Sequence, residues 1–203
     1  MIGVAVMGYG VVGSGVVELI DQNNKIFSEK IGQDIAVKHI LDVRDFPGNK
    51  YESLLTKDFN NILSDPETEI VCETIGGAKV AYDFTKRCLC AGKSVVTSNK
   101  ELVATHGTEL LALAKEHGVD YMFEAAVGGG IPIIRPLINC LAANRIDKIV
   151  GILNGTTNYI LTKMIKEKAS FSDALKEAQR LGYAEADPSA DVDGKDTCRK
   201  ICI

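Results

Sequence analysis

In the first part of the chain, short continuous runs of apolar residues alternate with longer segments in which apolar residues recur at helical spacing. The run at 2–7 is apolar apart from one glycine, and more glycines follow it at once, which is typical of a buried parallel strand. Later runs of the same kind predict further strands at 35–43, 70–75, 94–97 and 121–127. Runs this short, separated by longer segments, indicate a sheet whose strands are connected through helices.

Helices are predicted in the segments between these strands. After the first strand, apolar residues recur at the spacing of one helix face from Val12 to Ile20. The predicted helices at 80–91 and 101–117 each stop at a glycine, the residue that most easily adopts the left-handed conformation of a helix C-terminus. This alternation predicts an α/β fold with a Rossmann-type doubly wound parallel sheet.

The pattern changes at the sequence GGGIP, which begins at Gly128. A helix at 131–143, a strand at 146–153 and helices at 156–168 and 171–181 are expected after it. The last of these helices is preceded by Ser170, with Asp173 at the spacing of a capping box. We therefore predict two domains, 1–130 and 131–203, the second being part of an α+β domain. The ending RKICI has neither a glycine nor a charged tail, so we expect the second domain to be truncated.

Composition limits the class of protein. Of 203 residues, 46% are hydrophobic and 25% are charged, which allows a sizeable core and argues against disorder. The net charge of -4 gives no basic stripe, so nucleic acid is not an expected partner. No signal peptide is recognisable and no apolar run approaches the roughly 18 residues of a membrane span. We expect no membrane partner and a cytoplasmic location.

The six cysteines show no metal-binding spacing. They are Cys72, Cys88, Cys90, Cys140, Cys198 and Cys202. None belongs to a C-x-x-C pair, and most stand in apolar runs such as EIVCETI. We therefore interpret them as small core residues of a protein from a reducing compartment.

Gly8, Gly10 and Gly13 form the pattern G-x-G-x-x-G between the first strand and the first helix. In that context Gly8 permits a tight turn, Gly10 lets a pyrophosphate approach the backbone, and Gly13 allows the helix to pack closely on the strand. The pattern predicts dinucleotide binding. At the end of the second strand, Asp42 could accept a hydrogen bond from a ribose hydroxyl of NAD, whereas Arg44 could pair with the 2'-phosphate of NADP. NADP is favoured modestly over NAD.

The stretch YAEADPSADVDGKDTCRK, residues 183–200, is unusually acidic. It fails as an EF-hand calcium loop, because Ser189 and Lys200 occupy the first and twelfth ligand positions. Two interpretations remain from the residues alone: a solvated loop that opens a helix, or a site that binds a charged substrate and moves protons. Asp196 and Lys200 are four residues apart and would share one face of a helix.

Several stretches together resemble the homoserine dehydrogenase family. They are GYGVVGSGVVELI, ETIGG, VVTSNKEL, FEAAVGGGIPIIRPL, GILNGTTNYILTKM and LGYAEADPSADVDGKDTCRK, in family order and over essentially the whole chain. TSNK replaces the more usual TANK, and Gly129 stands where many members have alanine. The resemblance implies NAD(P)-dependent interconversion of L-homoserine and L-aspartate 4-semialdehyde. It also implies an NAD(P)-binding first domain, a substrate-binding and catalytic second domain, and a homodimer when the protein is complete.

The resemblance also implies roles for particular residues. Lys200 matches the general acid and base of the family, Asp196 orients it or holds the substrate hydroxyl, and Lys100 lies near nicotinamide and substrate. Substrate-binding roles fall on Gly155, Thr156, Tyr183, Glu185, Asp191 and Asp196, with Glu185 holding the amino group. Cofactor-binding roles fall on Gly8, Gly10, Val11, Val12, Gly13, Arg44, Ser98, Lys100 and Gly182.

A sodium ion is a further implication of the resemblance. It would be bound by the carboxylate of Glu124 and by the backbone carbonyl groups of Val127, Gly129 and Ile131, which are suitable ligands for a hard cation. A glycine-rich hinge between domains is the alternative for this segment.

Two other functions stay open at this point. A Rossmann protein that senses nucleotides without catalysis would not need Lys100, Glu185, Asp196 and Lys200 together. A dehydrogenase that acts on a different amino-acid aldehyde would need a similar set. Only an assay with the substrate separates this second alternative from the first assignment.

Overall fold

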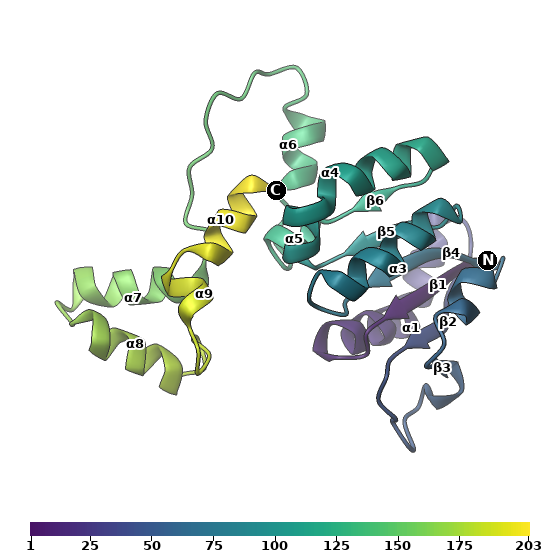
Figure 1. Ribbon diagram of the computed structural model, residues 1–203, viewed down its shortest axis with the longest axis horizontal. Coiled ribbons are helices and arrows are strands. Elements are labelled where there is room, and N and C mark those ends of the chain that lie inside the picture. The colour runs from purple at the N-terminus through teal and green to yellow at the C-terminus, as the bar shows by residue number, and fades with distance from the viewer. The chain divides into compact units, whose positions relative to one another are not determined.

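Six parallel strands form one sheet in the computed structural model of the protein, which describes all 203 residues (Figure 1). They are β1 (Ile2–Met7), β2 (Ile35–Leu41), β3 (Leu55–Thr56), β4 (Thr68–Glu73), β5 (Ser94–Thr97) and β6 (Tyr121–Met122), in the spatial order β3-β2-β1-β4-β5-β6. The order reverses between β1 and β4, where the connections leave in opposite directions. A cleft therefore opens at the carboxyl ends of these two strands, and open α/β sheets bind their ligands there.

The connections of the sheet are helical, as the periodicity predicts. They are α1 (Val11–Ile31), the 3-10 turn η1 (Glu52–Leu54), α2 (Asn60–Ser64), α3 (Lys79–Cys90) and α4 (Lys100–His117). Figure 1 shows α3 and α4 side by side over one face of the sheet. Right-handed crossovers put α1, which returns toward β2, on the other face. The predicted doubly wound parallel sheet is thus confirmed.

The centre of this unit is apolar. Val4 and Val6 of β1, Val17 of α1 and Ile40 of β2 are buried in one cluster. Burying an aliphatic side chain of this size stabilises the fold by roughly 1.5–3 kcal/mol. The cluster fixes α1 against β1 and β2, and it thereby fixes the glycine loop that joins β1 to α1.

The chain divides into two compact units, Met1–Pro136 and Leu137–Ile203. Helix α6 (Ile134–Cys140) crosses the division, and the second unit contains α7 (Gly155–Lys166), α8 (Phe171–Arg180), α9 (Ser189–Val192) and α10 (Lys195–Cys202). Ile160 of α7 packs on Ala174 and Ala178 of α8. Whether the two units correspond to the predicted functional domains 1–130 and 131–203 stays a prediction.

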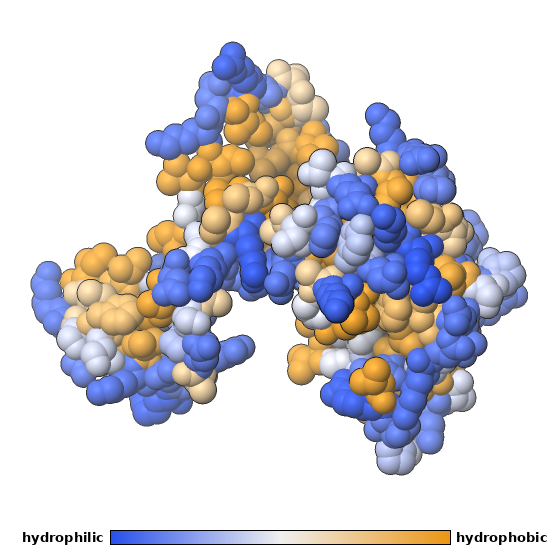
Figure 2. Space-filling model, in the orientation of Figure 1, coloured by the Kyte–Doolittle hydropathy of each residue, from blue (hydrophilic) through white to orange (hydrophobic).

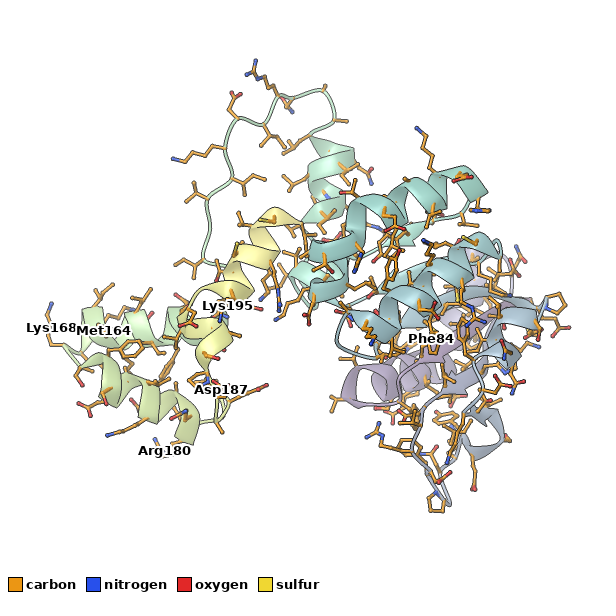
Figure 3. The ribbon with its side chains drawn as sticks, in the orientation of Figure 1. Phe84, Met164, Lys168, Arg180, Asp187 and Lys195 are labelled. Carbon is orange, nitrogen blue, oxygen red and sulfur yellow. The ribbon has the colours of Figure 1, made fainter.

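Helix caps in the second unit follow the expected chemistry. The Ser170 hydroxyl accepts a hydrogen bond from Asp173 N at 3.1 Å, so α8 begins where the capping pattern puts it. Gly182 has a φ of 78° and ends α8, while Tyr183 N donates to Ala178 O at 2.8 Å, as in a Schellman motif. Figure 3 shows Met164 and Lys168 at one end of the α7–α8 pair and Arg180 at the end of α8.

Several predicted elements are wrong in extent or type. The strand expected at 121–127 ends at Met122, and Glu124–Val127 form the short helix α5. The helix expected at 131–143 starts only at Ile134, because Gly130 is left-handed and Pro132 disfavours helical geometry at the residue before it. Strand β2 ends at Leu41, two residues before the predicted end.

The strand predicted at 146–153 is absent, so the α+β character expected of the second unit is not observed. These residues form no ladder, because the second unit holds no strand with which they could pair. Ile149, Val150 and Ile152 are exposed instead. Figure 2 shows the surface over α6 and the segment after it as a mixture of hydrophobic and hydrophilic residues.

The interpretation of the cysteines as core residues is also wrong for most of them. All six are free thiols, but Cys90, Cys140, Cys198 and Cys202 are exposed because each lies on an outward face of its helix. Burial raises the pKa of the Cys72 thiol to about 11 and that of Cys88 to about 12, so these two are unreactive core residues. None of the helices combines the length and apolar character that crossing a bilayer requires.

Candidate functional site

The loop between β1 and α1 has the geometry of a phosphate-binding turn. Gly8 has a φ of 93°, and a Cβ atom there would lie 2.8 Å from Thr74 O. A Cβ atom on Gly13 would lie 1.8 Å from Gly8 O, so only glycine lets the helix approach the strand this closely. By contrast, a Cβ atom on Gly10 would meet nothing within 4 Å, which leaves open space in front of the loop.

The N-terminus of α1 faces this open space without a protein cap. Gly10 is the N-cap residue and provides no side chain, while Val11 and Val12 are 93% and 53% exposed. The unpaired amide groups of a helix's first turn, together with its dipole, favour an anion. The loop therefore fits the pyrophosphate of a dinucleotide, with Val11 and Val12 contributing backbone rather than side-chain contacts.

Asp42 and Arg44, at the end of β2, form one hydrogen-bonded unit with the glycine loop. The Asp42 carboxylate accepts from Tyr9 N at 2.7 Å, from Arg44 N at 2.9 Å, and from the Arg44 guanidinium at 2.9 and 3.0 Å. Hydrogen bonds from Arg44 hold the pKa of Asp42 well below its usual value despite partial burial. The Asp42 side chain is 7% exposed and that of Arg44 is 58% exposed. The cation of this pair thus faces solvent, whereas the carboxylate faces the loop.

A cavity of about 270 Å³ lies between this pair and the loop that follows β4. Val43 lines one side, and Ile75, Val80 and Phe84 line the other. Figure 3 labels Phe84 on α3. Apolar walls with a guanidinium at the rim suit an adenine base whose ribose lies beside Arg44.

Glu73, at the carboxyl end of β4, is fully buried and connects two loops of the cleft. Its carboxylate accepts from Ile75 N at 2.8 Å and from the Thr97 hydroxyl at 2.5 Å. Thr97 Oγ1 in turn accepts from Asn99 N, and Asn99 caps α4, which begins at Lys100. Burial raises the pKa of Glu73, although these hydrogen bonds partly oppose the shift.

This network fixes the start of α4 at the edge of the sheet where the glycine loop also lies. Ser98 N donates to the backbone oxygen of Glu73 at 3.4 Å, and Lys100 directly follows Asn99, whose backbone N–H donates to Thr97. Tyr121 on β6 is buried nearby, and its hydroxyl makes no hydrogen bond. The structure thus brings together Gly8, Gly10, Gly13 and Arg44 at the glycine loop, and it places Ser98 and Lys100 at the end of β5.

The segment expected to bind sodium has a different observed arrangement at its carboxylate. Glu124 accepts hydrogen bonds from the backbone amides of Ile133, Ile134 and Arg135, and it thereby caps α6. These bonds lower the pKa of Glu124. The carbonyl oxygens of Val127, Gly129 and Ile131 accept no hydrogen bond. Carbonyl and carboxylate oxygens are ligand types that a hard cation takes, so the chemistry of this donor set is compatible with the expected ion.

In the second unit, Asp196 and Lys200 share one face of α10 and form an ion pair, with Lys200 Nζ 3.0 Å from Asp196 Oδ2. Asp196 is 3% exposed and the Lys200 side chain is 19% exposed. Lys200 Nζ also donates to Leu153 O at 2.9 Å. An ammonium group has three donors, so one N–H of Lys200 is left for a ligand.

The next residue, Asn154, connects this pair to Asp191. Its side-chain amide donates to Asp191 Oδ1 at 2.7 Å and to Asp196 Oδ2 at 2.9 Å. Its oxygen accepts from Thr157 N at 2.8 Å and caps α7. The sequence had assigned Asn154 no role. An asparagine close to the start of a predicted helix is a typical N-cap signal, but the predicted helix began at Thr156, one residue after the observed start at Gly155, so this signal was not assigned to Asn154.

Three predicted substrate-binding residues share a cavity of about 400 Å³ in this unit. Gly155, Thr156 and Tyr183 line it together with Tyr159. Thr156 Oγ1 donates to Tyr183 O at 2.6 Å, and the rings of Tyr159 and Tyr183 are 5.0 Å apart. Gly155 N and Thr156 N make no hydrogen bond within the protein and belong to the first turn of α7, so they can donate hydrogen bonds to a carboxylate.

Glu185 does not line this cavity. It is exposed in the loop between α8 and α9, and its carboxylate has no partner in the protein, while its backbone oxygen accepts from Gln179 Nε2. Figure 3 labels Asp187 and Lys195 in the same acidic region. Gly182, expected near the cofactor, ends α8 and has no other evident role in the structure.

Comparisons with known proteins agree over nearly the whole chain. A family model described as homoserine dehydrogenase, NAD binding domain, matches residues 8–124, and one described as homoserine dehydrogenase matches 132–203. The homoserine dehydrogenase of Bacillus subtilis is 46% identical over 98% of this chain and 47% of its own length. That of Lactococcus lactis is 42% identical over 100% of this chain and 48% of its own.

Solved structures give the same result. A homoserine dehydrogenase from Thiobacillus denitrificans has a TM-score of 0.89 and 43% identity, covering 98% of this chain and 47% of its own. A hyperthermophilic archaeal homoserine dehydrogenase in complex with NADPH has a TM-score of 0.83 and 30% identity, covering 99% of this chain and 67% of its own. This chain spans about half the length of the curated relatives it matches.

Proposed function

The chain belongs to the homoserine dehydrogenase family, and on that premise we propose that it carries the cofactor site and the proton-transfer residues of an NAD(P)-dependent oxidoreductase. The reaction is the interconversion of L-homoserine and L-aspartate 4-semialdehyde. One observation carries the proposal: a largely buried lysine on α10 keeps one ammonium N–H for a ligand while Asp196 and Leu153 O hold the other two.

Lys200 acts as the general acid in the direction of reduction. A bound reduced nicotinamide cofactor would supply the hydride that the aldehyde carbon needs. Lys200 Nζ gives a proton to the carbonyl oxygen, which becomes the hydroxyl group of homoserine. Asp196 keeps the ammonium group in place and balances its charge. In the direction of oxidation, the neutral amine accepts the hydroxyl proton.

The ends of an amino-acid substrate meet complementary groups. The unpaired amides of Gly155 and Thr156 at the N-terminus of α7 receive the carboxylate, and Tyr183 closes the same cavity. Glu185 holds the substrate ammonium, and Asp191 adds negative charge to the region. Lys100, at the start of α4, contacts nicotinamide and substrate in this proposal.

NADP is the preferred cofactor in this proposal. The inward orientation of Asp42 leaves no carboxylate facing a ribose 2'-hydroxyl, whereas the exposed Arg44 can receive a 2'-phosphate. Gly8, Gly10, Gly13, Val11 and Val12 bind the pyrophosphate through the backbone, and Ser98 contacts the nicotinamide end. Gly182 remains a cofactor-binding proposal that rests on resemblance alone.

Sodium, if bound, has a structural role. The carbonyl groups of Val127, Gly129 and Ile131 would hold it together with Glu124, and the ion would fix the turn that precedes α6. No proton or hydride passes through this position. A homodimer, which rests on the family resemblance, and a cytoplasmic location are further parts of the proposal.

The test uses the intact protein that contains these residues, with homoserine and NADP, and follows the absorbance of the reduced nicotinamide. Lys200→Met should lower kcat by roughly 10² to 10⁴, the usual contribution of a general acid, and leave the Kd of NADPH within a few-fold. Lys195→Met is the matched control, because Lys195 lies on the same helix and forms only a surface pair with Asp193.

Three results would contradict the proposal. Near-wild-type turnover of Lys200→Met would refute the role of this lysine. NADPH binding without turnover of any amino alcohol would favour a nucleotide sensor. Turnover of another amino alcohol in preference to homoserine would indicate a different aldehyde substrate.

A further inference from the structure

The side chain of Asn154 uses its whole hydrogen-bonding capacity. It is 6% exposed, and its amide nitrogen donates one hydrogen to Asp191 and the other to Asp196. Its oxygen accepts from Thr157 N at 2.8 Å and from Thr157 Oγ1 at 3.0 Å. An amide group has two donors and two acceptor positions, so all four are occupied and only one orientation satisfies them.

These bonds close a ring around the proton-transfer pair. Lys200 donates to Leu153 O and to Asp196 Oδ2, and the same Oδ2 atom accepts from Asn154. Leu153 and Asn154 are consecutive residues. Two adjacent positions of the chain therefore hold both members of the Asp196–Lys200 pair, one through a carbonyl oxygen and the other through an amide nitrogen.

The same amide nitrogen also holds two carboxylates near each other. Asp191 and Asp196 both carry carboxylate groups, and two like charges this close would repel if nothing stood between them. A neutral NH₂ group that donates to both offsets this repulsion without adding a charge that would compete with Lys200.

We propose that Asn154 is a positioning residue of the reaction: its amide nitrogen sets the place of Asp196, and through it the direction of the Lys200 ammonium. The inference rests on the proposed function, since it assumes that Lys200 transfers the proton. It goes beyond that function by separating the amide nitrogen of Asn154, which acts on the site, from its oxygen, which caps α7.

The rival explanation is that Asn154 serves only as an N-cap. The two explanations differ in what they expect of other capping residues. Aspartate and serine cap helices about as well as asparagine. Neither can donate two hydrogens to the carboxylates, and aspartate adds a third negative charge of nearly the same shape.

The experiment compares Asn154→Ser and Asn154→Asp with the wild type in the intact enzyme, at saturating NADP. We expect kcat for homoserine to fall about 10- to 100-fold in Asn154→Ser, the range that a small misplacement of a reacting group costs. Asn154→Asp should fall further than Asn154→Ser. The Kd of NADPH should stay within twofold in both variants, and circular dichroism at the assay temperature gives the folded fraction by which the rates are corrected.

Asn158→Ser is the matched control. Asn158 lies one turn further along α7, is exposed, and its side chain makes no hydrogen bond. It should therefore retain wild-type kcat. A role in capping alone would instead give wild-type kcat in Asn154→Asp, and that result, or equal corrected rates in all three variants, would overturn the proposal.

A second measurement does not depend on the variants' folding or on activity. In a ¹⁵N spectrum of the wild-type protein, the Asn154 side-chain NH₂ protons should exchange with water far more slowly than those of Asn158. They should also shift in Asp191→Asn. Exchange as fast as that of Asn158 would show that the bridge does not exist. If the bridge is present but the wild type does not oxidise homoserine, the proposed function fails while the geometry stands.

Discussion

Replacing Arg44 by alanine should change the balance between NADPH and NADH binding. In the structure the guanidinium uses Nε and one terminal nitrogen on Asp42, and that nitrogen also donates to Tyr9 O at 3.1 Å. The other terminal nitrogen makes no hydrogen bond to the protein. Arg44 can therefore bind a 2'-phosphate without releasing Asp42, so its removal takes away a phosphate partner that is already in position.

The magnitude follows from exposure and charge. A hydrogen bond to a charged group contributes roughly 1.5–3 kcal/mol, and solvent screening reduces this because 58% of the Arg44 side chain is exposed. We expect the Kd of NADPH to rise about tenfold, toward the lower end of what a charge-assisted hydrogen bond contributes. Asp42, no longer paired, would add repulsion toward the phosphate. For NADH the Kd should stay the same or fall, because the freed carboxylate can accept from a ribose hydroxyl.

The assay is a fluorescence titration with each reduced cofactor. These 203 residues contain no tryptophan, so they add no tryptophan background to the nicotinamide fluorescence. Lys50→Ala is the control for loss of a surface cation, since Lys50 pairs with Asp21 and is 70% exposed. The difference between the two cofactors should shrink at high salt. Equal weakening of NADPH and NADH would refute the assignment of Arg44 to the phosphate.

Two further predictions concern stability. Gly13→Ala should destabilise the protein by several kcal/mol, because the new methyl group would overlap Gly8 O. Gly15→Ala is the control: nothing lies within 4 Å of its Cβ position, so the change should be neutral or stabilise by up to about 1 kcal/mol. Thermal unfolding measures both variants, and equal melting temperatures would contradict the packing argument. Burial raises the pKa of Glu73 above its ordinary value of 4.5, so this group's contribution to the free energy of unfolding is greatest below pH 4.5 and is lost as pH rises through the raised pKa of the folded state. Urea unfolding should be measured for Glu73→Gln and for the wild type at several pH values. The free energy of unfolding of the variant, relative to that of the wild type, should increase from acidic to neutral pH. A difference that does not change with pH would show that the carboxylate is not desolvated.

The regular part of the fold was predictable because its signals are local. The glycine fingerprint and the apolar runs at 2–7 and 94–97 each carry their own evidence of strand or turn. The helices at α3 and α4 stop at left-handed glycines, as expected. The short strand β3 and the turn η1 escaped prediction, because two or three residues are too few to show a period.

What failed depends on partners that a local pattern does not contain. The segment 146–153 has the composition of a strand, but a strand exists only where another strand accepts its hydrogen bonds. Glu124 continues an apolar run and was expected to belong to a strand, yet it turns the chain because its carboxylate caps α6 nine to eleven residues later. Asn154 went unnoticed for a similar reason: its partners Asp191 and Asp196 are 37 and 42 residues away.

The acidic stretch can now be divided by the partners of its carboxylates. Asp191 accepts from Asn154, Asp196 pairs with Lys200, Asp193 pairs with Lys195, and Asp187 accepts from Ser189 N. Glu185 alone has a carboxylate with no partner inside the protein. A carboxylate that already accepts hydrogen bonds or forms an ion pair has less capacity left for a ligand than one without a protein partner. Glu185, to which the family resemblance assigns the substrate ammonium, is the acid of this stretch whose carboxylate keeps its whole hydrogen-bonding capacity, and this supports it as the proposed amine-binding group.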